Sequence, residues 1–250
     1  MTAGNSSIAA LWASTPQAAA AVFDPAQVAD LPAAAQSYLR HVIAAGTPLA
    51  SAVRLKMHGE IKLKKWYPFT AEQIIAWERG MIWQAAARMG WLSIGGSDSL
   101  LAGAGRMRWR LFGLVPVMSA SGPDITRSAA GRVNIESVWL PSVLCRPDVA
   151  WECNDGSNLV SRFVAHGEPA EIAYRLAATG APKSVSMRRW GNPGGDSFRL
   201  TDFGGFVEEE KRFGGYTIPT RMRIGWYFGS DRFETEGEFF RVCIDGAEFR

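Results

Sequence analysis

The sequence predicts an α+β fold in which a strongly curved antiparallel β-sheet forms a half-barrel. N-terminal helices precede the sheet, and one inserted helix packs on its concave face. Three observations support this fold class. Apolar and polar residues alternate along many short segments, turns rich in glycine separate these segments, and one helical segment interrupts them midway. Many consecutive antiparallel strands around one helix are expected to form a sheet that wraps the helix.

The most regular strand is expected from Tyr216 to Phe228, where residues alternate with a period of two. Gly214-Gly215 predicts a two-residue hairpin turn before it, because two glycines supply the positive φ values that such turns need. Gly229-Ser230-Asp231 predicts another turn after it. The flanking strands are expected to set carboxylates opposite Arg221 and Arg223, which helps to fix the register. These carboxylates belong to Glu208, Glu210, Glu234, Glu236 and Glu238.

Helices are expected in three places. Ile8–Val22 is rich in alanine, and Pro32–Ala45 follows Asp30, a candidate N-cap. The inserted helix spans Pro123–Leu140, because proline suits the first helical position and a second proline follows the last residue. Gly95-Gly96-Ser97-Asp98 is expected to be a turn between two short strands.

One domain is expected to contain the whole chain of 250 residues. Proline and glycine are spread through the turns rather than gathered in a linker, and no internal repeat is evident. Residues 31–250 would form the half-barrel. Residues 1–30 would be a loosely attached N-terminal helical segment.

Composition excludes several classes of protein. The net charge is only +3, and basic residues are interleaved with carboxylates, which argues against a nucleic-acid partner. Three cysteines without close spacing argue against a disulfide framework, and no two histidines are spaced for a metal. Motifs for phosphate, dinucleotide or nucleophile chemistry are missing, so neither a metal nor a cofactor is expected. The N-terminus lacks the charge pattern of a secretory signal and no segment suits a membrane span, so a cytoplasmic protein is expected.

The chain holds ten tryptophans, and most of them fall in the predicted sheet or its helix. Each indole buries a large ring and still needs a partner for its N–H group. Most are expected to pack in the core or on the sheet. Lining a cavity for an apolar or aromatic ligand is a natural use for the rest. The four expected in the cavity walls are Trp83, Trp109, Trp139 and Trp226.

The order of several short motifs resembles an uncharacterised bacterial protein family. The matching motifs are Leu31-Pro32, Tyr38-Leu39, Gly46-Thr47-Pro48, Trp66 to Gln73, Trp83-Gln84-Ala85, Gly103-Ala104-Gly105, Gly131 to Pro141 with Leu144, Trp151, Ile218-Pro219 and Gly225-Trp226. Members look like relatives of the lipoprotein-carrier type of half-barrel, a curved antiparallel sheet with helices plugging its concave face. Those carriers work outside the cytoplasm, a departure from the location expected here. The resemblance implies no established activity.

Candidate polar residues lie on the inserted helix. Arg132 and Glu136 are four residues apart and therefore share a helix face. If that face meets the cavity, a desolvated Glu136 could act as a general acid or base. Alternatively, the carboxylate forms a structural ion pair with Arg132 or with an arginine of the strand that carries Arg108.

Two further sets of basic residues are candidates. Arg106, Arg108 and Arg110 share one face of a strand, and together with Arg188-Arg189 they could grip an anionic group. A solvated outer face is the more common fate of such a row. His58 is a candidate for acid–base chemistry by residue type, but its alternation with charged neighbours favours a solvated face.

We therefore expect a cavity that binds a small hydrophobic or aromatic molecule, with an anionic group as one option. Trp83, Trp109, Trp139 and Trp226 would form its apolar walls, and Arg132, Glu136 and Arg108 its polar contacts. The alternative is a cofactor-free enzyme, a lyase, isomerase or cyclase, that uses Glu136 as acid or base. A third class is a module that binds a partner through an exposed strand edge.

Overall fold

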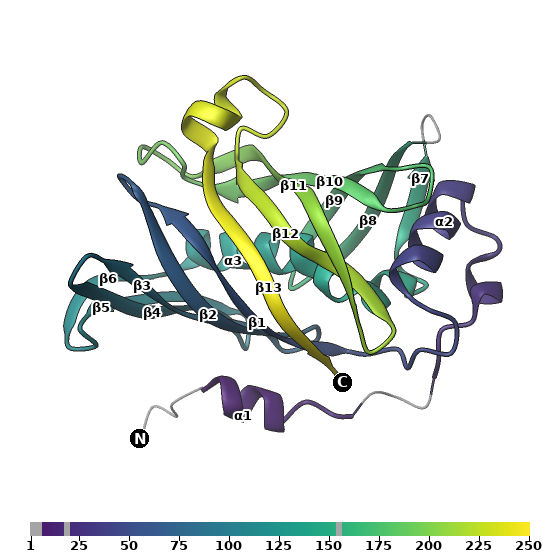
Figure 1. Ribbon diagram of the computed structural model, residues 1–250, viewed down its shortest axis with the longest axis horizontal. Helices are drawn as coiled ribbons and strands as arrows, with labels where there is room; N and C mark the ends of the chain where they lie inside the picture. Colours follow the sequence, from purple (N-terminus) through teal and green to yellow (C-terminus); the bar gives the residue numbers. More distant parts are fainter. Residues whose placement is uncertain (1–6, 18–20, 154–156) are drawn as a thin grey trace.

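The computed structural model describes residues 7–17, 21–153 and 157–250 and contains one open, curved sheet of 13 antiparallel strands (Figure 1). The strands are β1 (Ala52–Lys62), β2 (Trp66–Ala76), β3 (Gly80–Met89), β4 (Leu92–Leu101), β5 (Ala104–Leu111), β6 (Val115–Ser121), β7 (Ala150–Cys153), β8 (Asn158–Ala165), β9 (Glu168–Leu176), β10 (Pro182–Gly191), β11 (Arg199–Phe213), β12 (Tyr216–Trp226) and β13 (Glu238–Phe249). The helical segments are α1 (Ile8–Ala13), η1 (Pro25–Val28), α2 (Ala33–Val42), α3 (Pro123–Ile135), η2 (Glu136–Trp139), η3 (Pro141–Cys145) and η4 (Phe233–Gly237). The predicted fold class is confirmed.

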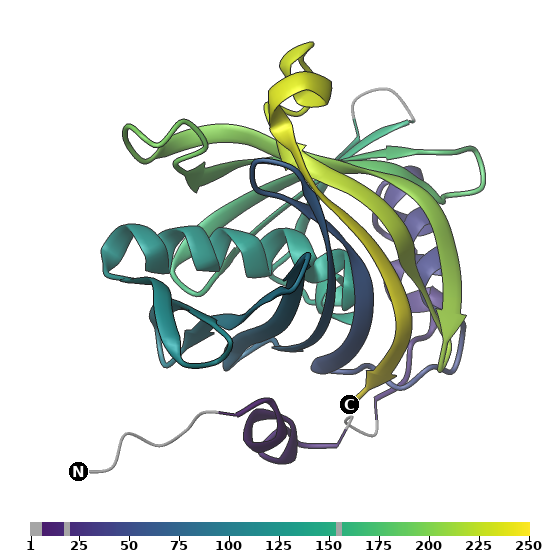
Figure 2. The ribbon, with the colours of Figure 1, turned by 60° about the vertical axis from the view of Figure 1, so that its left-hand side comes forward.

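The sheet consists of two meanders that meet in the middle. Strands β1 to β6 run outward from the centre to one edge, and β7 to β13 return from the other edge to pair with β1. The segment between β6 and β7 contains α3, η2 and η3, so it must cross from one edge to the other. Figure 2 shows α3 lying across the concave face of the sheet. This crossing places the helix directly above the strands that form the site.

The inserted helix begins where the sequence predicts and changes its winding near its end. Pro123 occupies its first turn with Asp124 beside it, which suits the helix dipole. The α-helical part ends at Ile135, and Glu136–Trp139 continues as a tighter 3₁₀ turn. The prediction of one helix through Leu140 is therefore correct in position but not in winding. Proline at the next position disfavours helical backbone at Leu140, which leaves the helix there.

The N-terminal helices contact different parts of the sheet. Helix α1 is shorter than predicted and ends at Ala13, close to Pro16. Its Trp12 is buried in a small apolar cluster with Ile74 and Ile82, separate from the main core. Helix α2 belongs to the main core instead, where Tyr38 packs against aromatic rings of β7 and β9. The predicted Asp30 cap is wrong, because α2 begins after Pro32 without a side-chain cap. The first expected helix also covers residues 18–20, which lie outside the described residues.

The Gly214-Gly215 turn between β11 and β12 is confirmed, with Phe213 paired to Tyr216 across it. The predicted charge pairing is only partly correct, because a bulge after Val207 shifts the register of β11. Consequently Glu209, not Glu208 or Glu210, forms the ion pair with Arg221, at 2.9 Å. Glu210 instead lies 3.0 Å from the imidazole of His41 on α2. Arg223 donates hydrogen bonds to the carboxylates of Glu234 and Glu238, as the sequence predicted.

The predicted turn at residues 95–98 is wrong, because β4 runs straight through it from Leu92 to Leu101. A glycine is needed at position 96 for another reason. A Cβ atom at Gly96 would lie 2.6 Å from the indole of Trp109 on the neighbouring strand. Glycine is therefore used here for a close approach between strands rather than for a turn. Asp98 therefore lies in the interior of a strand, not in a loop.

The two glycines of the β11–β12 turn are expected to differ in how well they tolerate substitution. Gly215 has φ of 94°, and a Cβ there would lie 2.3 Å from the hydroxyl of Thr47. Gly214 has φ of 54° and open space around it, a conformation that asparagine also adopts. Gly215→Ala is expected to lower the free energy of unfolding by about 1–3 kcal/mol, and Gly214→Asn by about 0.5 kcal/mol or less. Urea titration of both variants measures the difference, and equal effects would contradict it.

Candidate functional site

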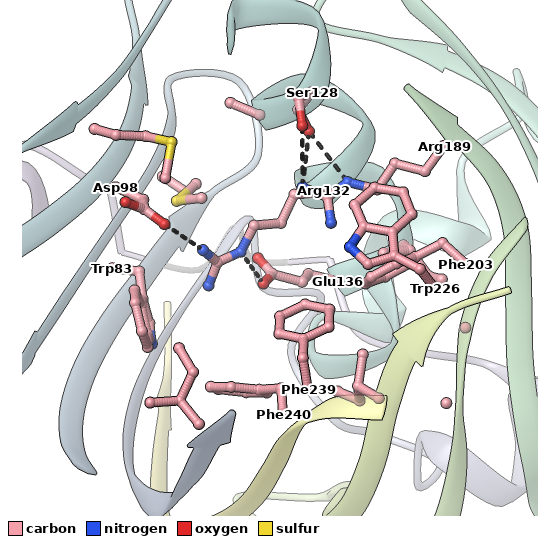
Figure 3. Close-up of a pocket in the computed structure, with 18 of the residues that line it drawn as sticks. Trp83, Asp98, Ser128, Arg132, Glu136, Arg189, Phe203, Trp226, Phe239 and Phe240 are labelled. Atoms are coloured by element: carbon pink, nitrogen blue, oxygen red, sulfur yellow. Dashed lines mark hydrogen bonds and ion pairs between the residues drawn. The ribbon is translucent and has the colours of Figure 1, made fainter. Parts of the chain in front are cut away.

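A cavity of about 350 Å³ lies between the inserted helix and the concave face of the sheet (Figure 3). Its walls are mainly apolar, and their aromatic residues come largely from strands on both sides of the sheet centre. The aromatic residues are Trp83, Trp139, Phe198, Phe203, Trp226, Phe239 and Phe240. Trp83 and Phe240 pack edge to face, as do Phe203 and Trp226, so the rings support one another. Contacts of Phe239 with Phe240 and with Phe203 join these two pairs, so five of the seven rings form one connected surface.

An ionic centre formed by Arg132 of α3, Glu136 of η2 and Asp98 of β4 lines this cavity. Arg132 donates from Nε to Oε1 of Glu136 at 2.7 Å, across one turn of the helix. Its Nη1 also donates to Oδ2 of Asp98 on β4 at 3.3 Å. All three side chains are largely shielded from solvent. A single guanidinium thus lies between two carboxylates and connects the helix to the sheet.

A neutral hydrogen-bond donor binds the remaining oxygen atom of each carboxylate. The fully buried Gln73 on β2 donates from Nε2 to Oε2 of Glu136 at 2.6 Å. The indole N–H of Trp109 donates to Oδ1 of Asp98 at 3.0 Å. Each carboxylate therefore has both oxygen atoms engaged. Charged groups buried in this way are stable only when their hydrogen-bonding capacity is satisfied.

The low polarity of the surroundings changes the ionisation of the ionic centre. Burial raises the pKa of Asp98, although the nearby Arg132 and the Trp109 hydrogen bond act in the opposite direction. Burial alone would lower the pKa of Arg132, but Glu136 and Asp98 outweigh it and raise that pKa above the ordinary value. The guanidinium also lies 4.9 Å from the centre of the Trp83 ring. Arg132 is thus held in its charged form.

A second arginine lies in the cavity wall without a carboxylate beside it. Arg189 on β10 is only 9% exposed, and its Nε and Nη2 donate to the backbone carbonyl of Ser128 at 3.2 and 3.1 Å. Its guanidinium carbon lies 4.7 Å from the centre of the Phe203 ring and 5.2 Å from that of Trp226. Burial, together with the positive charge of Arg132, lowers the pKa of Arg189.

Five of the residues predicted for the site line the cavity, and three do not. The five are Trp83, Arg132, Glu136, Trp139 and Trp226. Trp109 does not line the cavity, and its ring centre lies 5.6 Å from that of Trp83, which does. Arg108 and Arg106 are both exposed on the same strand, and of the two only Arg106 lines the cavity. His58 is exposed and lies 2.9 Å from Asp245, away from the cavity.

Sequence reasoning missed Gln73 and Asp98, and it did not single out Arg189 from its neighbour Arg188. Gln73 gave one usable signal, since it is polar where the alternate positions Phe69, Ala71, Ile75 and Trp77 are all apolar. Alternation also separates Arg188 from Arg189, because adjacent residues of a strand point to opposite faces. Asp98 gave no such signal because its glycine-rich context resembles a turn.

The fold and the cavity define a class of protein: a half-barrel whose inserted helix carries a buried ionic centre beside an aromatic cavity. Residues 29–249 match the model of a family of unknown function, DUF6920, and the chain belongs to that family. The expectation of an uncharacterised family is thereby confirmed. No curated protein matches the chain.

Two solved structures are similar to the chain. One is a domain from Vibrio parahaemolyticus named for outer membrane lipoprotein sorting, with 9% identity and a TM-score of 0.42, covering 80% of this chain and 86% of that one. The other is a LolA superfamily protein from Nitrosomonas europaea, with 10% identity and a TM-score of 0.44, covering 87% of this chain and 92% of that one. Within residues 7–17, 21–153 and 157–250, no helix is long and apolar enough to cross a membrane.

Proposed function

We propose that this protein binds a small hydrophobic or aromatic molecule in the cavity beneath α3. The observation that supports the proposal is the cavity itself, about 350 Å³ in volume with a largely apolar wall that includes seven aromatic residues. Pockets of this size and composition suit small organic ligands. The rings are held by contacts with one another, so the pocket keeps its shape without a ligand and little ordering is needed on binding.

The enzymatic alternative assigns Glu136 the role of acid or base. That role requires a carboxylate oxygen that faces the reacting proton of a bound substrate. In this structure Oε1 accepts from Arg132 and Oε2 accepts from Gln73. A catalytic Glu136 would have to give up one of these buried hydrogen bonds during each turnover. The geometry favours a structural Glu136 and a binding function for the cavity.

Filling the cavity tests the proposal. Ala129 lies on α3 and lines the cavity, so Ala129→Trp would place an indole inside it. The probe is N-phenyl-1-naphthylamine, a neutral aromatic molecule that fluoresces more strongly in apolar surroundings. Wild-type protein is expected to bind it, and Ala129→Trp to bind it about tenfold more weakly, because the added ring excludes the probe.

A matched substitution controls for the added indole. Val164 is exposed and does not line the cavity, so Val164→Trp should bind the probe as the wild type does. Thermal unfolding of both variants checks that they fold. Native mass spectrometry of freshly purified wild-type protein gives an independent measurement of any molecule carried from the host cell. A wild-type protein that neither binds the probe nor carries a small molecule would contradict the proposal.

A further inference from the structure

Three arginines line the cavity: Arg106 is exposed, and the two that are largely shielded from solvent, Arg132 and Arg189, differ in their partners. Arg132 has two carboxylates within hydrogen-bonding distance, Asp98 and Glu136. Arg189 has no ion pair with any carboxylate in the described part of the chain, and its acceptors are the carbonyl and hydroxyl oxygens of Ser128. Arg189 is therefore a buried cation whose charge is not balanced by direct contact with an anion.

The guanidinium of Arg189 also retains hydrogen-bonding capacity. An arginine carries five N–H donors, and those at Nη1 have no acceptor among the residues that the structure describes. The aromatic faces of Phe203 and Trp226 lie beside the guanidinium and, like Arg189, line the cavity. Figure 3 shows the three side chains together at one side of the cavity. Rings of this kind stabilise a cation but accept hydrogen bonds poorly.

We propose that the ligand is an amphiphile with one anionic headgroup, a carboxylate, and that Arg189 binds this headgroup while the apolar part packs on the aromatic wall. This inference rests on the proposed ligand-binding function and names the class of molecule. A guanidinium binds a carboxylate through paired charge-assisted hydrogen bonds, which are stronger than bonds between neutral groups. The bound anion would give Arg189 a direct ionic partner and would offset the effect of burial on its pKa.

The ionic centre helps to exclude other headgroups. Arg132 already has two carboxylate partners, so a ligand anion gains less from it than from Arg189. A cationic headgroup would meet Arg189 in an apolar environment, where repulsion between like charges is strong. A monoanion matches Arg189, the buried cavity arginine that lacks a carboxylate partner among the described residues, whereas a dianionic phosphate would bring a second charge without a buried partner.

The test compares decanoate, decan-1-ol, decylamine and decyl phosphate by isothermal titration calorimetry at neutral pH, using protein freed of bound lipid. The wild type is expected to bind decanoate about tenfold more tightly than decan-1-ol, because the two differ only in the headgroup. Arg189→Met keeps much of the apolar volume and is expected to remove this preference, with binding of the alcohol maintained. Arg188→Met is the matched control, because Arg188 is exposed on the same strand, and it should keep the preference.

The outcomes separate this inference from the proposed function. Failure of the alcohol and of the acid to bind the wild type would contradict the proposed function itself. Equal affinity for acid and alcohol would overturn the role of Arg189 while leaving apolar binding in place. Loss of the preference in Arg106→Met but not in Arg189→Met would also overturn it, since Arg106 lines the same cavity. Tighter binding of decyl phosphate than of decanoate would overturn the choice of a carboxylate. The wild-type comparison decides the headgroup preference even if Arg189→Met does not fold.

Discussion

Arg132→Met is expected to lower the free energy of unfolding by about 3–5 kcal/mol. The substitution keeps the length of the side chain but removes the only cation in direct contact with Asp98 and Glu136 among the described residues. Both carboxylates would then lie beside the aromatic wall without a counter-charge, and an unpaired buried charge is costly. For a chain of this length such a loss corresponds to a fall of about 10 °C in the melting temperature. Calorimetry and urea titration measure the two quantities.

A combined variant identifies the cause of this loss. Arg132→Met with Asp98→Asn and Glu136→Gln removes the two negative charges along with the positive one. Replacing all members of a buried ionic cluster by neutral groups is much less costly than removing one member. We expect the triple variant to be more stable than Arg132→Met alone. A triple variant that is less stable would show that packing, rather than uncompensated charge, explains the effect.

Trp139→Ala is expected to lower the free energy of unfolding by about 3–5 kcal/mol as well, for a different reason. The indole is 3% exposed and packs at the end of the inserted helix against the concave face. Its N–H group donates to the backbone carbonyl of Pro219 on β12 at 3.1 Å. Truncation removes this hydrogen bond and leaves a large void under η2, which the surrounding residues cannot fill completely. Thermal unfolding measures the change.

Trp91 provides the matched control for this truncation. It is 83% exposed at the turn between β3 and β4, where its ring stacks on Phe112. Trp91→Ala is expected to change the free energy of unfolding by about 0.5 kcal/mol or less, as for most surface substitutions. A Trp139→Ala variant as stable as Trp91→Ala would mean that the helix does not depend on this contact for its position over the sheet.

Strand alternation made most of the fold predictable because it is a local property of the sequence. The alternation in β12 and the two glycines before it correspond to a strand and a turn without reference to any distant residue. The inserted helix was predictable for the same reason, since its proline and its acidic first turn lie next to each other in the chain. Such features depend on residues within a few positions.

The polar residues of the site were harder to predict because the residues that they contact are distant in the sequence. Gly96 is required by Trp109 on the next strand, and nothing close to Gly96 reveals this contact. Gln73 is buried because Glu136 lies above it, although sixty-three residues separate them. The pair Arg132 and Glu136 was predictable from helical spacing alone. The partners of that pair were not, since they depend on how the helix lies across the sheet.

The arrangement of the sheet as two meanders bears on the order in which the site assembles. Within each meander neighbouring strands are joined by hairpins or short connections, and contacts of that kind form quickly because little chain entropy is lost. The pairing of β1 with β13 differs, since it brings Val53 beside Phe249 near the far end of the chain. Trp83 and Asp98 come from the first meander, whereas Arg189 and Trp226 come from the second. The cavity can therefore exist only after this long-range pairing has formed, so ligand binding reports that the two meanders have joined.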